Sequence, residues 1–315
     1  MTDATWAPDD DLREAAALLS CADPARRAAG YDRLAARAAP GGDALRAWAV
    51  DTVLPRAGRE PDGCALSVLV EVLEAAQDGR ALPALLELAG HRDEEVRRAV
   101  AKALPFVGDP APDSPRVRAL LALSRDGDRD VRDAAVFGLG TLDEAYSPAV
   151  RAALRERLDD EDEEVAEEAV RGLANRQDAE VLPRLIGLLE AHVEPHPLTL
   201  SAAAVLGRPE LLPVLAELAA EHPDDPRIAA ALAACDPYRR AESAALAWRL
   251  LEELSARRPD LDAALAWPRF SPDLHLELRH GPEPVTYHAE NLLTRAGRDP
   301  SRAAALVDAE CPPAA

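Results

Sequence analysis

The sequence predicts an all-α protein, a right-handed α-solenoid of stacked antiparallel helix pairs with a C-terminal cap that contains a candidate β-hairpin. Two markers recur in phase and support this prediction. Leucines recur at steps of 33 to 35 residues, at positions 34, 69, 104, 139, 173 and 206. Prolines open an apolar stretch once per period, at positions 83, 115, 148, 183 and 213. Such periods indicate stacked repeats, because one helix pair cannot bury both of its faces alone.

Each repeat is expected to hold two helices for local reasons. Proline lacks the N–H that a first helical turn leaves unpaired, so it suits the start of the first helix. Asp93, Asp128 and Asp162 each stand three residues before a valine and can cap the second helix. Apolar residues then follow at i, i+4 and i+8, which forms one buried stripe of a 3.6-residue helix.

The repeats are predicted to occupy residues 1–236, about six in all, and the cap residues 237–315. Within the cap, residues 239–257 have the pattern of one long amphipathic helix, and residues 261–267 that of a short one. Leucines alternate with polar residues after that, and we place a candidate hairpin at residues 273–288.

The pattern D-x-x-V-R-x-x-A with a closing Leu-Gly resembles HEAT repeats, and its short period is similar to the bacterial class named after phycobilisome lyases. The resemblance covers roughly residues 9–236 and is strongest over 81–218. It implies an Asp–Arg ladder, which Ala166 interrupts where Arg97 and Arg132 stand in the two preceding repeats. Tetratricopeptide repeats have a similar period, but their Trp-x-x-Leu-Gly-x-x-Tyr opening is missing.

Charge and composition exclude several classes of function. The chain has 36 basic and 57 acidic residues, a formal net charge of −21. Because phosphate backbones repel such a surface, nucleic acid is not an expected partner. The acidic N-terminal residues do not form a signal peptide, and no apolar run is long enough to cross a membrane. We therefore expect a cytoplasmic protein, while its oligomeric state stays open.

No catalytic or metal-binding cluster is predicted. The four cysteines are at least 43 residues apart, too far for a zinc or redox motif. No nucleophile elbow or phosphate loop occurs. The deoxyhypusine hydroxylases, which are HEAT-repeat enzymes, hold iron with His-Glu pairs, and no histidine here precedes a glutamate. We expect no enzyme activity, no cofactor and no metal.

The strongest local anomaly is the run DDEDEEVAEE at residues 159–168, with eight acidic residues and no basic one. An acidic helix start is the simpler interpretation, because carboxylates are favourable there. The other interpretation is a binding edge for a basic partner, favoured by charge complementarity. We call the six residues that precede Val165 the acidic edge: Asp159, Asp160, Glu161, Asp162, Glu163 and Glu164.

The second helices of the repeats present the other candidate surface. Phe137 is either an aromatic anchor for a partner or a part of the core. We call the predicted partner-binding residues the helix-B surface: Arg97, Arg98, Lys102, Arg132, Asp133, Phe137, Glu167, Glu168 and Arg171.

These features lead to one hypothesis and two alternatives. The leading hypothesis is a non-catalytic scaffold or adaptor that binds another protein through the helix-B surface and the acidic edge. One alternative is an acidic inhibitor or immunity-type protein that neutralises a basic partner, or a nucleic-acid mimic. The other, implied by the resemblance alone, is a lyase-like subunit that handles a small molecule or tetrapyrrole.

Overall fold

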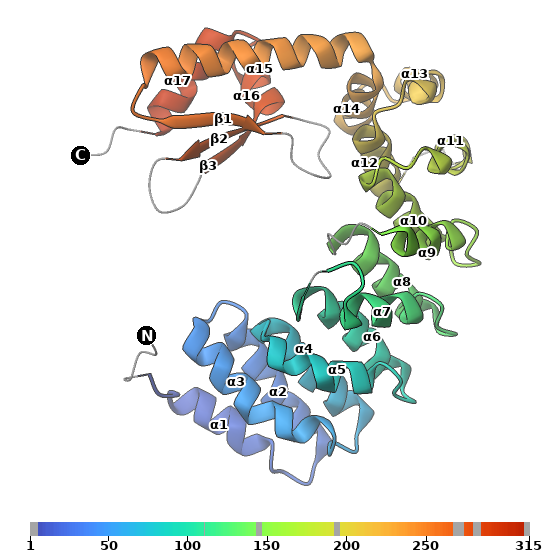
Figure 1. The fold of residues 1–315 in the computed structure, drawn as a ribbon, viewed down its shortest axis with the longest axis vertical. Helices are drawn as coiled ribbons and strands as arrows, with labels where there is room; N and C mark the ends of the chain where they lie inside the picture. Colours follow the sequence, from blue (N-terminus) through green and yellow to red (C-terminus); the bar gives the residue numbers. More distant parts are fainter. Residues whose placement is uncertain are drawn as a thin grey trace. The chain divides into compact units, whose positions relative to one another are not determined.

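The computed structural model describes residues 6–109, 111–142, 147–191, 196–266, 274–279 and 285–311 (Figure 1). The chain divides into two compact units, residues 1–173 and 174–315. The predicted boundary at residue 236, where the repeat rhythm changes, lies inside the second unit and stays a prediction.

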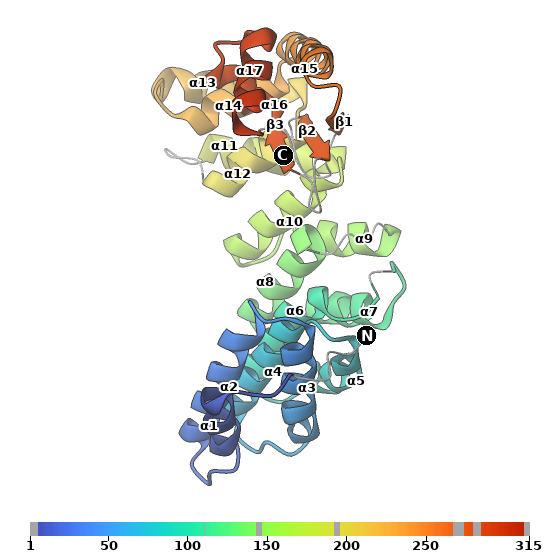
Figure 2. The ribbon, with the colours of Figure 1, turned by 90° about the vertical axis from the view of Figure 1, so that its left-hand side faces the viewer.

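The first unit is a stack of helix pairs arranged in two layers (Figure 2). The first helices of the pairs are α1 (Asp10–Leu18), α3 (Asp43–Ala57), α5 (Leu82–Leu88), α7 (Pro115–Leu123) and α9 (Pro148–Glu156). The second helices are α2 (Pro24–Ala38), α4 (Gly63–Ala76), α6 (Glu94–Ala103), α8 (Arg129–Phe137) and α10 (Glu163–Asn175). The α-solenoid prediction is confirmed, because α2, α4, α6 and α8 pack on one another in sequence order.

Helix starts follow the predicted local rules. The carboxylates of Asp93 and Asp128 accept hydrogen bonds from the N–H groups of Glu95 and Val131, both at 3.1 Å. Ser114 caps α7 in the same way, and a proline follows it at the first helical position. Unpaired N–H groups at these helix ends thus find acceptors within two or three residues.

The periodic leucines form the centre of the core. All six of them are at most 1% exposed: Leu34, Leu69, Leu104, Leu139, Leu173 and Leu206. A 3₁₀ turn, η2 (Leu104–Phe106), and a π-helical turn, η3 (Gly138–Leu142), follow α6 and α8. The repeat period therefore corresponds to one buried leucine per helix pair.

The second unit continues the pattern and then changes it. It contains the pairs α11 (Leu182–Ala191) with α12 (Pro197–Leu206), and α13 (Leu212–Glu221) with α14 (Pro226–Cys235). Short 3₁₀ turns precede three of the first helices of the chain: η1 (Gly79–Ala81), η4 (Ala179–Val181) and η5 (Pro209–Leu211). Asp236 ends α14 and caps α15 (Pro237–Arg257), because its carboxylate accepts from the N–H groups of Tyr238 and Arg239.

The C-terminal part contains a three-stranded antiparallel sheet in the order β1-β2-β3. Its strands are β1 (Asp262–Ala266), β2 (His275–Arg279) and β3 (Val285–His288), and α16 (Ala289–Arg295) and α17 (Pro300–Glu310) follow. The strand pairing of the predicted hairpin is confirmed, because β2 pairs with β3 from His275↔His288 to Leu278↔Val285. Residues 273 and 280–284 of that prediction lie outside the described residues. The helix predicted at 261–267 is wrong. Pairing with β2 outweighs the helical preference of its alanines.

This C-terminal part has an apolar core of its own. Leu276 and Leu278 on β2 are fully buried against Leu250 and Leu254 of α15 and Leu293 of α16. All of the residues in this core belong to 246–311. In the part of the chain that the structure describes, no helix is both long and apolar enough to cross a membrane.

Candidate partner-binding surface

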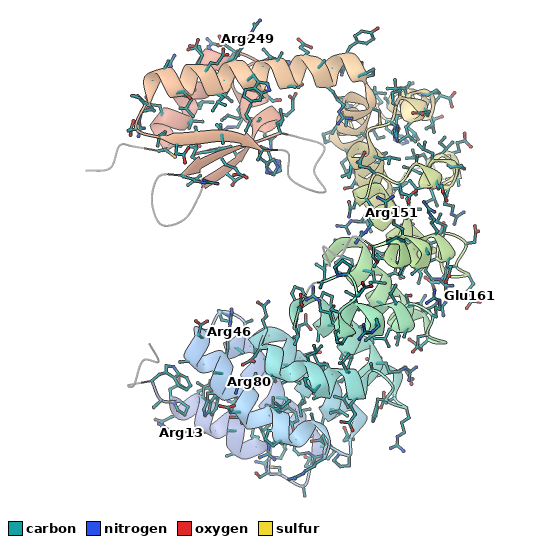
Figure 3. All side chains as sticks on the ribbon, in the orientation of Figure 1. Arg13, Arg46, Arg80, Arg151, Glu161 and Arg249 are labelled. Atoms are coloured by element: carbon teal, nitrogen blue, oxygen red, sulfur yellow. The ribbon has the colours of Figure 1, made fainter. Side chains whose placement is uncertain are left out.

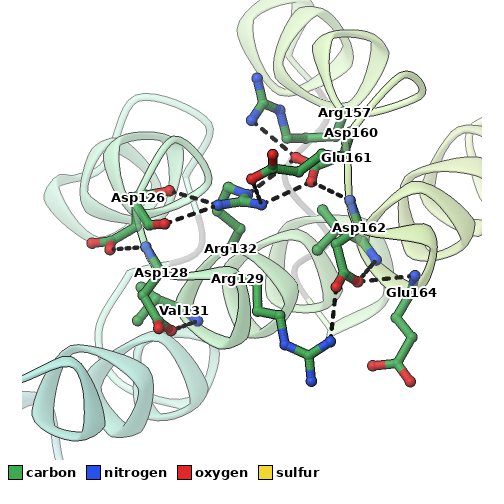
Figure 4. A network of polar contacts seen from close by, with 12 residues as sticks. Asp126, Asp128, Arg129, Val131, Arg132, Arg157, Asp160, Glu161, Asp162 and Glu164 are labelled. Carbon is green, nitrogen blue, oxygen red and sulfur yellow. Dashed lines mark hydrogen bonds and ion pairs between the residues drawn. The ribbon is translucent and has the colours of Figure 1, made fainter.

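Arg132, on the helix-B surface, holds two repeats together (Figure 4). Its Nε and Nη2 donate to Asp160 Oδ2 and Oδ1 at 3.1 and 2.9 Å. Its Nη1 donates to the backbone carbonyls of Asp126 and Gly127 in the turn before its own helix. The side chains of Arg132 and Asp160 are only 6% and 3% exposed. Arg132 therefore has almost no surface to offer a partner.

Arg97 repeats this arrangement one repeat earlier. It donates to Asp126 through Nε at 2.8 Å and Nη2 at 2.9 Å, and its Nη1 reaches the carbonyl of His91. Arg27 forms the same kind of pair with Glu60. The pairs Arg97–Asp126 and Arg132–Asp160 are the Asp–Arg ladder that the resemblance implies, and Ala166 ends it in the next repeat.

Two residues of the acidic edge are committed to the fold. Besides Arg132, Asp160 accepts from the N–H of Asp162 at 3.1 Å. Burial alone would raise the pKa of Asp160, but Arg132 and this N–H hold the pKa below its usual value. Asp162 caps α10 by accepting from the N–H of Glu164 at 3.1 Å, and it also pairs with Arg129 at 2.9 Å.

The other four residues of the acidic edge are exposed. Glu161 is 87% exposed, projects from the loop between α9 and α10, and lies 3.3 Å from Arg132 (Figure 3). Asp159, Glu163 and Glu164 are exposed as well. The acidic edge therefore contains two residues that stabilise the fold, Asp160 and Asp162, and four that are exposed to solvent.

Lys102 occupies the middle of the helix-B surface. It is exposed on α6, and its positive charge opposes the rise in pKa that burial causes for Glu74 on α4 and Asp133 on α8. Arg98, on the same helix, forms an ion pair with Glu95. One lysine therefore acts on carboxylates of two neighbouring helices.

Phe137 is half-buried at the end of α8, beside Arg171 of α10. The Arg171 guanidinium carbon lies 5.8 Å from the centroid of the Phe137 ring, within cation–π range. The ring is neither a fully buried core residue nor a free anchor. It forms a cation–aromatic pair at the surface.

Glu168 is the most unusual carboxylate of the helix-B surface. Glu168 and Glu167 are each 9% exposed, and Oε2 of Glu168 is buried with no hydrogen-bond donor among the residues that the structure describes. Oε1 lies 3.7 Å from Arg171 Nη1, too far for a hydrogen bond. Burial raises the pKa of Glu168 to about 7, and the charges of Asp133 and Glu167 add to the effect of burial, while Arg171 opposes it.

Three carboxylates on different helices have a pKa that burial raises. Burial also raises the pKa of Asp133, with Glu164 as the next cause, and it raises the pKa of Glu74 on α4. Glu74 was missed in the sequence. Its spacing of seven residues from Ser67, which precedes the marker leucine by two, is the signal that could have placed it on this face.

No metal site is evident in this region. Across the described ranges, no group of three or more His, Cys, Asp or Glu side chains is arranged to hold a metal ion. The helix-B surface contains charged side chains, the Phe137 ring and the Oε2 atom of Glu168, which has no hydrogen-bond donor in the described ranges.

A family model of HEAT repeats matches residues 50–121 and 117–206. The chain is a HEAT-like repeat protein. Protein YibA of Escherichia coli (strain K12) is 32% identical over 141 residues, which are 45% of this chain and 48% of YibA. The chain thus matches about half the length of this curated relative.

Solved structures place the HEAT-like repeats among helical repeat proteins. The X-ray structure of Escherichia coli YibA is 25% identical with a TM-score of 0.57, covering 71% of this chain and 80% of that one. The complex of CpcE and CpcF of phycocyanin lyase from Nostoc sp. PCC7120 is 16% identical with a TM-score of 0.45, over 74% of this chain and 97% of that one. That second likeness is too distant to bear on function.

Proposed function

We propose that this HEAT-like protein is a non-catalytic scaffold that binds a partner protein through its helix-B surface. The observation that carries the proposal is the buried Glu168 carboxylate beside Arg171, whose guanidinium lies over Phe137. A buried acceptor without a donor costs about 1–3 kcal/mol, and a donor from a partner would recover part of that cost. Repeat stacks present extended surfaces of this kind to their partners.

The charges of the surface favour a partner segment that contains lysine or arginine. Glu74, Asp133 and Glu168 all have raised pKa values, and in each case burial is the first cause. A cation placed among them would stabilise their ionised forms. The net charge of −21 would also speed the encounter with a basic protein.

Phe137 supplies the apolar element of the proposed contact. Aromatic and arginine side chains are enriched among the residues that dominate binding energy. Phe137 and Arg171 stand together, one from α8 and one from α10. A partner that covers this pair would bury the ring. It would also supply a carboxylate or a carbonyl oxygen that binds the guanidinium.

Neutralisation of a basic partner by the acidic edge is the second candidate function. The exposure of Asp159, Glu161 and Glu163 favours it. It is the weaker candidate, because Asp160 and Asp162 already bind arginines and N–H groups of the protein itself.

The experiment begins with affinity purification of a partner and its identification by mass spectrometry. The partner is then produced alone, and its Kd is measured for the wild type and the triple variant R98A/F137A/E168Q. A control triple, E87Q/R92A/F106A, removes the same three residue types from exposed positions elsewhere in the first unit. We expect the first triple to weaken binding by about 100-fold or more and the control by less than about threefold. Equal affinities for all three proteins would contradict the proposed surface.

A further inference from the structure

A cavity of about 470 Å³ opens at the N-terminal end of the repeat stack, where the C-terminal ends of α1 and α3 meet α2. Leu19 and Tyr31, which are 2% and 0% exposed, form its floor. Pro55 and Pro61 line it at exposed positions. Its volume lies within the range of about 300–1,000 Å³ typical of small-molecule sites.

The one carboxylate of the cavity is fully engaged. Glu60 accepts from Arg27 through Nη2 at 2.6 Å and Nε at 2.8 Å, and from the hydroxyl of Tyr31 at 3.3 Å. It also accepts from the N–H of Asp62 at 3.3 Å. Burial alone would raise the pKa of Glu60, but Arg27 and this N–H hold the pKa below its usual value. Glu60 and Arg27 therefore balance each other.

Two further arginines line the cavity, and their charges are not neutralised in this way. Neither Arg56 nor Arg59 forms an ion pair with any carboxylate that the structure describes. Arg56 makes one long hydrogen bond, at 3.4 Å, to the carbonyl of Leu19, and Arg59 is exposed at the rim. Three arginines against one glutamate leave two positive charges in this cavity, in a chain whose net charge is −21.

We propose that this cavity binds a small organic anion. Its carboxylate or phosphate group pairs with Arg56 and Arg59, since the guanidinium fork matches both groups. Its apolar body rests on Pro55 and Pro61, which line the cavity at exposed positions. The Arg27–Glu60 pair fixes one wall and keeps its own charges satisfied, so the incoming anion meets no free carboxylate there.

Isothermal titration of the full chain with phenyl phosphate tests the proposal. Benzylamine, which has the same ring and the opposite charge, is the control ligand. The variant R56Q/R59Q removes the two unbalanced charges. The variant R26Q/R92Q removes two exposed arginines outside the cavity and so matches the change in net charge.

We expect saturable binding of phenyl phosphate, weakened by about tenfold or more in R56Q/R59Q and by less than about twofold in R26Q/R92Q. Inorganic phosphate, which lacks the apolar body, should bind more weakly than phenyl phosphate. R59E, a change at an exposed position, should abolish binding while the circular dichroism spectrum stays that of the wild type. The proposal is overturned if phenyl phosphate gives no saturable heat at millimolar concentration, if benzylamine binds as well, or if both double variants lose affinity equally.

Discussion

The guanidinium of Arg132 forms two hydrogen bonds with the carboxylate of Asp160, and these side chains from successive repeats are almost completely buried. A buried charge pair of this kind makes the stability of the fold depend on both of its members. If either member were removed, the other would stay buried and lose two charge-assisted hydrogen bonds, which is more costly than the loss of a surface ion pair.

Substitution of Arg132 by methionine should therefore lower the free energy of unfolding by about 2–4 kcal/mol. The loss of stability is smaller than for a fully unpaired carboxylate, because Arg157 also pairs with Asp160 at 3.2 Å. R129M is the matched control, since Arg129 pairs with Asp162 but is 61% exposed. It should cost less than about 1 kcal/mol. Urea unfolding measures both, and equal losses would show that Arg132 does not act as a buried clamp.

Two glycines should respond to alanine with opposite signs. A β-carbon on Gly172 in α10 would lie 2.7 Å from the α-carbon of Gly140, whereas one on Gly187 in α11 meets nothing within 4 Å. G172A should destabilise the protein by about 1–3 kcal/mol through overpacking. G187A should stabilise it by up to about 1 kcal/mol through helix propensity. Thermal unfolding of the two variants checks this, and a stabilising G172A would contradict the close helix approach.

Glu168 should make stability depend on pH near neutrality. Its pKa is about 7 in the folded protein against 4.5 for the ordinary group. Between these values the folded state keeps the proton and the unfolded state loses it, so the free energy of unfolding falls as pH rises through this window. The full shift corresponds to about 3 kcal/mol. Asp160, whose pKa is lowered, contributes stability that is lost only as pH falls below its ordinary value of 3.8.

The measurement is urea unfolding at a series of pH values from 5 to 8. E168Q should flatten the profile and raise stability at the alkaline end. E163Q, at an exposed glutamate of the same helix, should leave the slope unchanged. A wild-type profile that coincides with that of E168Q would rule out the raised pKa.

Binding of a basic partner should release protons at pH 7. Glu168 is close to half-protonated at that pH, and a partner cation would lower its pKa. Titration calorimetry in two buffers of different ionisation enthalpy gives the number of protons released. E168Q should reduce that number. An unchanged number of released protons would show that the partner's cation does not bind beside Glu168.

Repeat periodicity predicted the fold because it records burial directly. Each marker leucine faces the core, and Asp93 and Asp128 cap the helices that they were predicted to start. The strand β1 could not be predicted, because the sequence DAALA favours a helix until β2 lies beside it. Long-range pairing decides such a segment.

The candidate site was harder to predict from the sequence. Arg97 and Arg98 are neighbours on one helix, but their side chains point about 100° apart. Arg97 thus enters the next repeat's turn, and Arg98 stays at the surface with Glu95. The role of Glu74 and the cavity beside Glu60 depend on contacts between repeats, which a pattern within one repeat does not contain.

Basic segments are proposed to bind the helix-B surface rather than the acidic edge. The most direct measurement is the Kd of a fluorescent peptide of alternating lysine and arginine, at one ionic strength, for two variants that each lose three carboxyl groups. E74Q/D133N/E168Q removes three carboxylates at the helix-B surface, and D159N/E161Q/E163Q removes three at the acidic edge. We predict that the first variant binds the peptide at least about tenfold more weakly than the wild type and that the second changes the Kd by less than about threefold. Equal losses in the two variants, or a larger loss in the second, would contradict the claim.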